Sequence, residues 1–128
     1  MSENKDSEPT LLIHPSGEEV WRLPNGNRHR LDGPAVVKPD GTREWWIQGE
    51  RHRSNGPAII CADGSESWYQ NGLLHRVDGP AVSTPDGGMQ WWSRGNLHRS
   101  DGPAVIRENG AEEWYQNGFL HRDGGPAM

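Results

Sequence analysis

The sequence has little cysteine, no long apolar run and no signal-like start. Cys61 is the only cysteine among 128 residues, which excludes an intramolecular disulfide and gives no sign of an oxidising compartment. We interpret it as a small apolar side chain rather than a nucleophile. No stretch approaches the ~20 apolar residues of a membrane span, and the opening MSENKDSEPT has no apolar segment. The sequence therefore predicts a cytoplasmic protein without a membrane span, beginning with a disordered acidic lead over residues 1–10.

Large aliphatic side chains are also scarce, and so are lysines. Leu, Ile, Val and Phe number 20 in total, which is low for a compact core, whereas seven tryptophans argue against disorder. A net charge of −5 lacks the basic excess that duplex nucleic acid attracts, so we do not expect that activity. All basic residues except Lys5 and Lys38 are arginines, the cation that stacks and binds in fixed geometry.

What the sequence does contain is a 23-residue period, which histidines, tryptophans and turn glycines share. The members are His29, His52, His75, His98 and His121; Trp45, Trp68, Trp91 and Trp114; and Gly26, Gly49, Gly72, Gly95 and Gly118. Self-similarity at such a period indicates a repeat architecture, in which neighbouring units bury surface that one unit cannot bury alone. We expect a single repeat domain over residues 11–128, with about five repeats and irregular ends.

Each period contains two turn signals between short β-prone runs. The first unit, as in AVVKPDGTREWWI, joins a β-branched run to an aromatic run through Ser-Gly, Asp-Gly or Asn-Gly, a strong hairpin signal. The second, as in NGLLHRVDGPA, returns as a short strand carrying His-Arg and is interrupted at Asp-Gly-Pro, because proline cannot donate to a ladder. No 3.6-residue apolar stripe is present. The sequence predicts an all-β fold, an antiparallel β-hairpin repeat meander with about two strands per period.

The runs WYQNGLLH and WYQNGFLH resemble MORN repeats. That family's pattern is an aromatic residue, then Asn-Gly, then His-Gly, in a repeated β-hairpin, and the likeness covers roughly residues 11 to 128. The chain departs from the pattern by carrying Arg instead of Gly after each histidine, followed by the Asp-Gly-Pro-Ala block. This variant is similar to the divergent MORN-like proteins of bacteria, phages and giant viruses, some of which are named as antitoxin components.

The resemblance implies an elongated, curved, single-layer sheet with a groove. It also implies a role in protein scaffolding, dimerisation or contact with a lipid surface, and it implies no catalysis. Fold is a weak guide to function, so the partner has to be inferred from the residues of this chain.

The histidine column is the feature that most suggests a metal site. Equivalent residues of neighbouring repeats lie two strands apart, about 9.6 Å at ~4.8 Å per strand, whereas the ligands of one zinc ion lie ~2 Å from it. The five histidines therefore cannot form one metal site. We expect each ring to pack beside a tryptophan and to hydrogen-bond turn backbone.

The pairs Arg30–Asp32, Arg76–Asp78 and Arg99–Asp101 suggest acid–base chemistry. An active site requires one preorganised set of groups, whereas these pairs are copies of one arrangement along an open sheet. We expect a ladder of ion pairs that joins successive repeats. We predict no catalytic residue, no bound metal and no cofactor.

Two adjacent aromatic columns face opposite sides of the predicted sheet, since neighbouring strand residues alternate. The first never changes and suits a packing spine: Trp21, Trp45, Trp68, Trp91 and Trp114. The second varies: Leu23, Trp46, Tyr69, Trp92 and Tyr115. Because Trp and Tyr are favoured interface anchors, the predicted binding residues are Trp46, Tyr69, Trp92 and Tyr115, with Leu74, Leu97 and Phe119 near the turns. A second packed layer on this column is the alternative.

These patterns favour a non-enzymatic protein-binding module, an adaptor or inhibitor such as an antitoxin or a phage counter-defence protein. An acidic side formed by Glu44, Glu66, Glu112 and Glu113 suggests a protein partner with a basic surface. Two alternatives stay open: a binder of a small anionic ligand such as a nucleotide signal, and a hydrolase that uses one His, Arg and Asp set. Because an open meander leaves edge strands unpaired, we also expect a homodimer.

Overall fold

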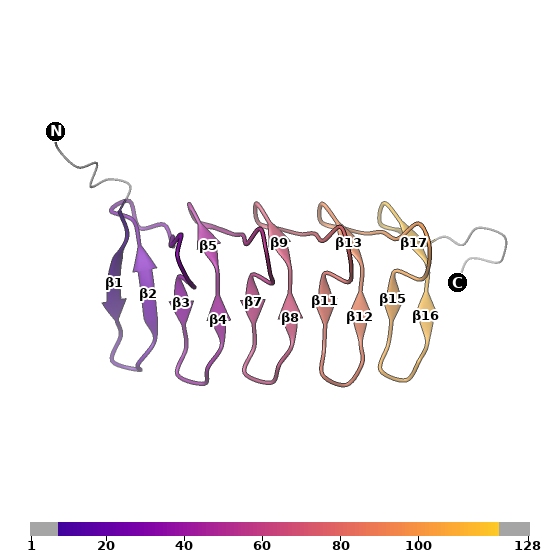
Figure 1. Cartoon of the computed structure of the whole chain (residues 1–128), viewed down its shortest axis with the longest axis horizontal. Helices are drawn as coiled ribbons and strands as arrows, with labels where there is room; N and C mark the ends of the chain where they lie inside the picture. The colour runs from indigo at the N-terminus through magenta and orange to yellow at the C-terminus, as the bar shows by residue number, and fades with distance from the viewer. Residues whose placement is uncertain (1–7, 121–128) are drawn as a thin grey trace.

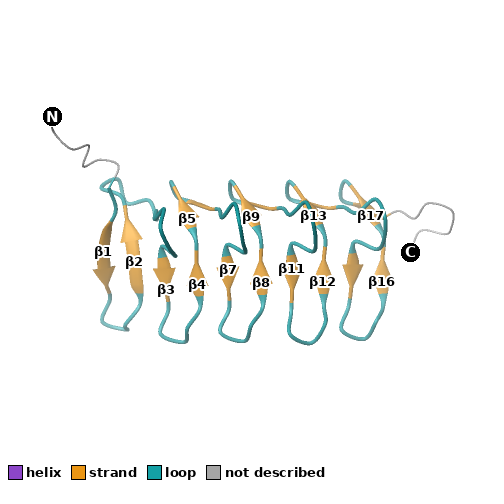
Figure 2. Cartoon of the chain, in the orientation of Figure 1, coloured by secondary structure: helices purple, strands orange, loops and turns teal. Residues whose placement is uncertain are grey.

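The computed structural model describes residues 8–120, and every regular element in this range is a β-strand. The chain advances from one end of an elongated molecule to the other, one hairpin after another (Figure 1). Strands and turns alternate with no helix between them in the described range (Figure 2). This part of the chain consequently offers no apolar helix of membrane-spanning length. Residues 1–7 of the predicted lead, and His121, lie outside the described residues.

Ten strands form one antiparallel sheet, in the order β1-β2-β3-β4-β7-β8-β11-β12-β15-β16. They are β1 (Thr10–Ile13), β2 (Glu19–Arg22), β3 (Val36–Val37), β4 (Arg43–Glu44), β7 (Ile59–Ile60), β8 (Glu66–Ser67), β11 (Val82–Ser83), β12 (Met89–Gln90), β15 (Val105–Ile106) and β16 (Glu112–Glu113). Each repeat contributes two neighbouring strands to this sheet. The predicted all-β hairpin meander is confirmed.

The other strands form four two-stranded hairpins in a row at one end of the sheet, the upper row in Figure 1. They are β5 (Trp46–Ile47) with β6 (Glu50–Arg51), β9 (Tyr69–Gln70) with β10 (Leu73–Leu74), β13 (Trp92–Ser93) with β14 (Asn96–Leu97), and β17 (Tyr115–Gln116) with β18 (Phe119–Leu120). A full repeat therefore holds four short strands rather than the two that the sequence predicts.

The doubling arises at the invariant tryptophan, which lies alone between two strands. The backbone N–H of Trp45 donates to the carbonyl of Ala58 in the main sheet, at 2.7 Å. Its carbonyl accepts from the N–H of His52, at 3.1 Å, in the upper row. The chain thus changes ladder partners at this residue, so β4 stays in the main sheet and β5 begins the small hairpin. The His-Arg pair, expected within a strand, follows β6 directly.

Two kinds of glycine turn close the hairpins, as the sequence predicts. In the main sheet, Lys38 and Thr42 flank a turn in which Gly41 has φ 96° and Asp40 Oδ1 accepts from the N–H of Thr42 at 2.9 Å. In the upper row, both central residues have positive φ, as at Gln48 (51°) and Gly49 (84°). That is the type I′ turn, whose twist matches the strands that it joins.

The core is a column of small and β-branched side chains rather than large aliphatics. The alanine of each Asp-Gly-Pro-Ala or Asn-Gly-Pro-Ala block is fully buried: Ala35, Ala58, Ala81 and Ala104, each at 0% exposure. The N–H of Ala58 donates to the carbonyl of Ser67 at 2.8 Å, while its own carbonyl accepts from Trp45. Each alanine thus links two repeats from a fully buried position.

Three hydrogen bonds also join each upper hairpin to the preceding repeat. Between the first two repeats, the N–H of Arg30 donates to the carbonyl of Trp46 at 3.1 Å, and the N–H of Gly49 donates to the carbonyl of Arg28 at 2.9 Å. The third runs from the N–H of Gln48 to His29 Nδ1, at 2.9 Å. We call these three bonds a seam, and the same pattern recurs in later repeats.

The first repeat is irregular because its extra residue lies in the turn after Trp21. Trp21 bonds to Ala35 and His29 as Trp45 bonds to Ala58 and His52, so the two tryptophans are equivalent. Arg22, which bridges to Arg28, therefore takes the place of Trp46. The assignment of Leu23 to the second aromatic column is wrong, and this side chain is instead buried at 4% exposure. Strand β1 begins at Thr10, the last residue of the predicted lead.

Candidate functional site

The arginine after each histidine lies flat on the invariant tryptophan of its own repeat. The guanidinium carbon is 4.5 Å from the ring centroid for Arg30 over Trp21, and 3.9, 3.8 and 3.9 Å for the equivalents. The equivalent pairs are Arg53 over Trp45, Arg76 over Trp68 and Arg99 over Trp91. We call these four pairs the Trp–Arg stacks. A guanidinium over an indole face is a favourable cation–π arrangement.

The other side of each guanidinium presses against the glycine of the loop that follows. A Cβ placed on Gly79 would lie 3.0 Å from the guanidinium carbon of Arg76, and one on Gly102 only 2.7 Å from that of Arg99. The next residue, a proline, supplies a carbonyl that accepts from the arginine Nη1, as at Pro80 (3.2 Å). The glycine is therefore explained by the space that the guanidinium occupies.

Three of the four arginines also form an ion pair, but within one loop and not between repeats. The distances from Nε to Oδ1 are 2.9, 2.9 and 3.1 Å. The pairs are Arg30–Asp32, Arg76–Asp78 and Arg99–Asp101. The prediction that these ion pairs join successive repeats is wrong. Each aspartate lies only two positions after its arginine, so the pair forms within one loop. The hydrogen bond from the arginine, and then its charge, lower the pKa of Asp32 and Asp78.

The histidines join successive repeats through their ring nitrogens. Nδ1 of His52, His75 and His98 accepts from the backbone N–H of a turn residue 19 positions later, at 3.0 Å in each case. An accepting Nδ1 requires the proton on Nε2. The expectation that these rings hydrogen-bond turn backbone is confirmed for the described histidines. Within residues 8–120, no three His, Cys, Asp or Glu side chains lie close enough to hold a metal ion.

The second aromatic column contributes one residue to each upper hairpin, on the face opposite the Trp–Arg stacks. In each upper hairpin, its aromatic residue pairs across the two strands with the residue before the histidine. The pairs are Trp46 with Arg51, Tyr69 with Leu74, Trp92 with Leu97, and Tyr115 with Leu120. We call these eight residues, together with Arg28, the aromatic ladder. The structure thus brings together six of the predicted binding residues.

Phe119 is the predicted binding residue that the ladder leaves out. It pairs with Gln116, whereas the adjacent Leu120 pairs with Tyr115. Since neighbouring strand residues face opposite sides, Phe119 points to the face of the Trp–Arg stacks, where it is 76% exposed. Its grouping with Tyr115 is therefore wrong.

Two arginines that the sequence analysis missed complete the N-terminal part of the ladder. Arg51 lies 4.8 Å from the Trp46 ring and 5.6 Å from the Tyr69 ring, and Arg28 lies 5.1 Å from Trp46 on the other side. Neither forms an ion pair with a described residue. Nε of both is buried without a hydrogen-bond partner among the described residues. The sequence offered one signal for these two residues: the position before the histidine is Arg in the first two repeats and Leu in the later ones.

The four glutamates do not form one acidic side. Glu44 is buried at 8% exposure on the ladder face, where it accepts from Trp46 Nε1 at 2.9 Å. Glu113 lies on the same face and pairs with Arg107 at 3.0 Å. Glu66 and Glu112 point to the opposite face, because each precedes a ladder-face residue in its strand. The basis for expecting a basic partner is therefore lost.

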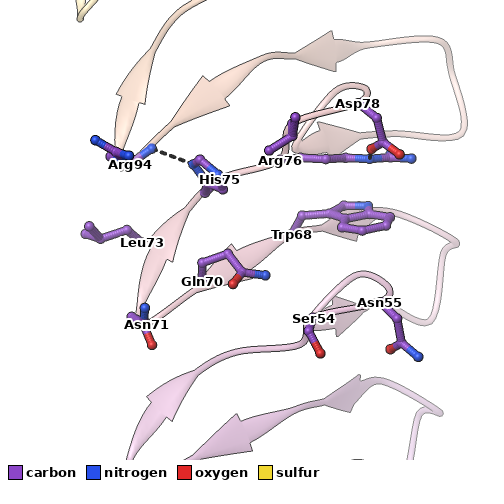
Figure 3. Close-up of a pocket in the computed structure, with 11 residues that line it drawn as sticks. Ser54, Asn55, Trp68, Gln70, Asn71, Leu73, His75, Arg76, Asp78 and Arg94 are labelled. Carbon is purple, nitrogen blue, oxygen red and sulfur yellow. Dashed lines mark hydrogen bonds and ion pairs between the residues drawn. The ribbon is translucent and has the colours of Figure 1, made fainter.

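Clefts open between successive loops on the face of the Trp–Arg stacks. The cleft of about 830 Å³ in Figure 3 has Trp68 in its wall, between Arg76 of the same repeat and the Ser54–Asn55 loop of the preceding one. Equivalent clefts contain Trp45 and Trp91. Cys61 lines none of these three clefts. Burial, and then nearby carboxylates, raise the pKa of its thiol, which disfavours the nucleophilic thiolate.

Comparison with known proteins adds no assignment to this geometry. No family model matches the chain, and no curated protein matches it.

Proposed function

We propose that the chain is a non-enzymatic protein-binding module, an adaptor or inhibitor, and that it binds its partner through the aromatic ladder. The observation that carries this proposal is the recurrence of the ladder pair in four successive hairpins that the seam joins, with Trp and Tyr alternating along one face. Aromatic and arginine side chains are the residues that dominate protein interfaces. An antitoxin-like or phage counter-defence role is the finer form of this proposal.

The charge along the ladder supports an acidic partner. Arg22, Arg28 and Arg51 lie at its N-terminal end and form no ion pair with described carboxylates. Leu74, Leu97 and Leu120 take the equivalent places at the other end. A partner segment with carboxylates at one end and apolar side chains at the other complements this gradient.

The buried Nε atoms support the same surface. A buried donor without an acceptor costs about 1–3 kcal/mol, and a functional site is one setting in which proteins keep such a donor. Arg28 and Arg51 carry this cost on the ladder. An apolar residue at these places, as at Leu74, has no such donor, so the two arginines support recognition at this surface in addition to their stacking on the rings.

The hydrolase and small-anion alternatives have weaker support. Arg30, Arg76 and Arg99 already bind an aspartate and a proline carbonyl while they stack on tryptophan. The histidine Nδ1 atoms accept from backbone. Groups held in this way offer few donors or bases to a substrate.

The test is affinity capture from a lysate of the natural host with the tagged full-length chain. Wild type should retain a protein partner in stoichiometric amounts. Arg51→Glu and Trp92→Ala should each reduce the recovered partner at least tenfold, about 1.4 kcal/mol. Arg94→Glu makes the same charge change at an exposed turn residue that lines a cleft on the opposite face, and it is the matched control. Circular dichroism establishes that each variant is folded.

Capture of a partner that survives both ladder variants would reject the ladder as the binding surface. Absence of any stoichiometric protein partner would reject the protein-binding module itself.

We further infer a homodimer formed through strand β1. This strand pairs only with β2 within the described chain, and its side chains Leu11, Leu12 and Ile13 are 37%, 51% and 61% exposed. An apolar, uncharged edge strand is a template for pairing with another chain. Antiparallel pairing of two β1 strands would continue the sheet across the dimer.

A further inference from the structure

The second repeat lacks the ion pair that the arginine of the Trp–Arg stack forms in the neighbouring repeats. In the other three described stacks, the arginine Nε donates to an aspartate two residues later, at 2.9 to 3.1 Å. In the second repeat the corresponding residue is Asn55. No hydrogen bond joins Arg53 to Asn55 among the described contacts.

Every other contact of the Arg53 guanidinium is conserved in the stack. It lies 3.9 Å from the Trp45 ring centroid, as Arg99 does from Trp91. Its Nη1 donates to the carbonyl of Pro57 at 3.1 Å. A Cβ on Gly56 would lie 2.8 Å from its guanidinium carbon. The side chain is therefore held in the same position as the others, but with Nε unpaired.

The unpaired edge of Arg53 is open to solvent. The buried side-chain nitrogens without a partner in the described chain belong to Arg28 and Arg51, not to Arg53. Arg53, Ser54 and Asn55 line one wall of a cleft of about 610 Å³, whose other wall includes Asp32. The carboxylate of Asp32 is already paired with Arg30.

The charges around Arg53 leave it without a counter-ion. Arg43 lies over the same indole, 5.8 Å from the Trp45 ring centroid. Burial, and then the charge of Arg43, lower the pKa of Arg53, and the charge of Glu66 raises it by a smaller effect. Glu66 forms no ion pair with Arg53 in the described structure. An arginine remains charged in any such environment, so the second stack carries an uncompensated cation.

We propose that Arg53 and Asn55 form a binding site for a carboxylate group, which takes the position that the aspartate side chain occupies in the other stacks. The free edge of Arg53 offers Nε and Nη2 side by side, a pair of donors that matches the two oxygens of a carboxylate. The amide of Asn55 supplies a further donor. The tethered aspartates show that a carboxylate fits at this place.

This site is independent of the aromatic ladder, because it lies on the opposite face. Two sources share the chemistry: an acidic side chain of a protein partner, and a free small carboxylic acid. The other repeats suggest two control variants. Asn55→Asp gives the second stack the aspartate that the other stacks have, and Asp78→Asn removes that aspartate from the third stack.

The experiment follows the Nε–Hε signals of the arginines by NMR while sodium acetate is added to the full chain. Sodium chloride at equal ionic strength is the reference. In wild type, the Arg53 signal should shift saturably, and the Arg30, Arg76 and Arg99 signals should not. In Asn55→Asp, the apparent affinity at Arg53 should fall at least tenfold, because the site is filled internally. In Asp78→Asn, Arg76 should become responsive.

A wild-type Arg53 signal that moves no more with acetate than with chloride would overturn the proposal. So would an Asn55→Asp protein that responds as wild type does. Backbone spectra identify any variant that fails to fold, and Asp101→Asn then replaces Asp78→Asn as the gain-of-site variant.

Lysate capture then distinguishes the two sources of the carboxylate. If Asn55→Asp loses a protein that wild type retains, the carboxylate belongs to that protein. If capture is unchanged while acetate binding is lost, the ligand is a free small acid. The result for Asn55→Asp can be interpreted even if the ladder variants do not affect capture. The two sets of substitutions lie on opposite faces, so each tests its own surface.

Discussion

At the scale of single residues, four upper turns place a non-glycine residue in the left-handed region. Their φ values are 51°, 51°, 50° and 51°, at Gln48, Asn71, Arg94 and Asn117. Asparagine tolerates this conformation better than other L-residues, for which it costs about 1–2 kcal/mol. Gln48 and Arg94 therefore strain their turns, and the exposed side chain of each takes no part in the seam, which uses only its backbone N–H.

We expect Gln48→Asn and Arg94→Asn each to stabilise the fold by about 1 kcal/mol, since the strained residue is replaced by one that fits the turn. The free energy of unfolding in urea measures this gain. Asn71→Gln is the reverse control and should lose a similar amount. If neither Arg94→Asn nor Asn71→Gln changed the free energy of unfolding, the turn conformation would carry no such strain.

The residue scale is also where the sequence was least informative. The period placed each histidine beside a turn, and the hydrogen bonds from turn backbone to the histidines were predicted. The stacking of each arginine on a tryptophan was not predicted. The partner of each arginine was not predicted correctly. A period of 23 residues does not show whether Arg76 pairs with Asp78 in its own loop or with a carboxylate one repeat away. Only the bend at Gly79, which brings the proline carbonyl to the guanidinium, decides this.

At the scale of elements, the hairpins were predictable and their division was not. Asp-Gly and Asn-Gly dipeptides mark the turns in the sequence, as at Gly41 and Gly72. The two strands on either side of Trp45 look like one aromatic run in the sequence. Nothing in the residue types shows that the N–H of Trp45 bonds to the main sheet while its carbonyl bonds to the upper row. The four aromatic residues that were predicted to share one face do so, at Trp46, Tyr69, Trp92 and Tyr115.

We expect wild type to sediment as a dimer, and Leu12→Lys to sediment as a monomer, because a charge on the exposed edge strand opposes pairing. Leu12 is 51% exposed, so the substitution leaves the core intact. Leu73→Lys is the matched control: Leu73 is 50% exposed on an upper hairpin, away from β1, and its variant should stay dimeric. A wild-type monomer at high protein concentration would refute self-association, and a dimeric Leu12→Lys would refute β1 as its site.

At the scale of the whole molecule, the repeats stack as a one-dimensional array. Each repeat is joined to the next through the main sheet, the buried alanine and the seam, and stability is then close to a sum over neighbouring interfaces. One complete repeat should therefore be removable without loss of the fold. The uniform 23-residue step makes residues 54–76 a suitable segment, because Arg53 then precedes Val77 as Arg76 does now.

We expect the chain lacking residues 54–76 to fold and to unfold with a smaller urea m-value. The decrease should be about a fifth, since m scales with the surface exposed on unfolding. Circular dichroism and urea titration measure both properties. Deletion of residues 54–65 alone removes half a repeat, disrupts the strand order and should abolish folding. Loss of folding in the first deletion would contradict the array model.

The seam has one further consequence, for how the protein forms. Its bonds connect residues 16 to 21 positions apart, as from Arg30 to Trp46 and from Arg28 to Gly49, and the most distant described side-chain hydrogen bond also spans 21 positions. No described hydrogen bond joins residues of distant repeats. Such local connectivity favours fast folding, and each repeat can dock on its predecessor as soon as it leaves the ribosome, in the order of synthesis.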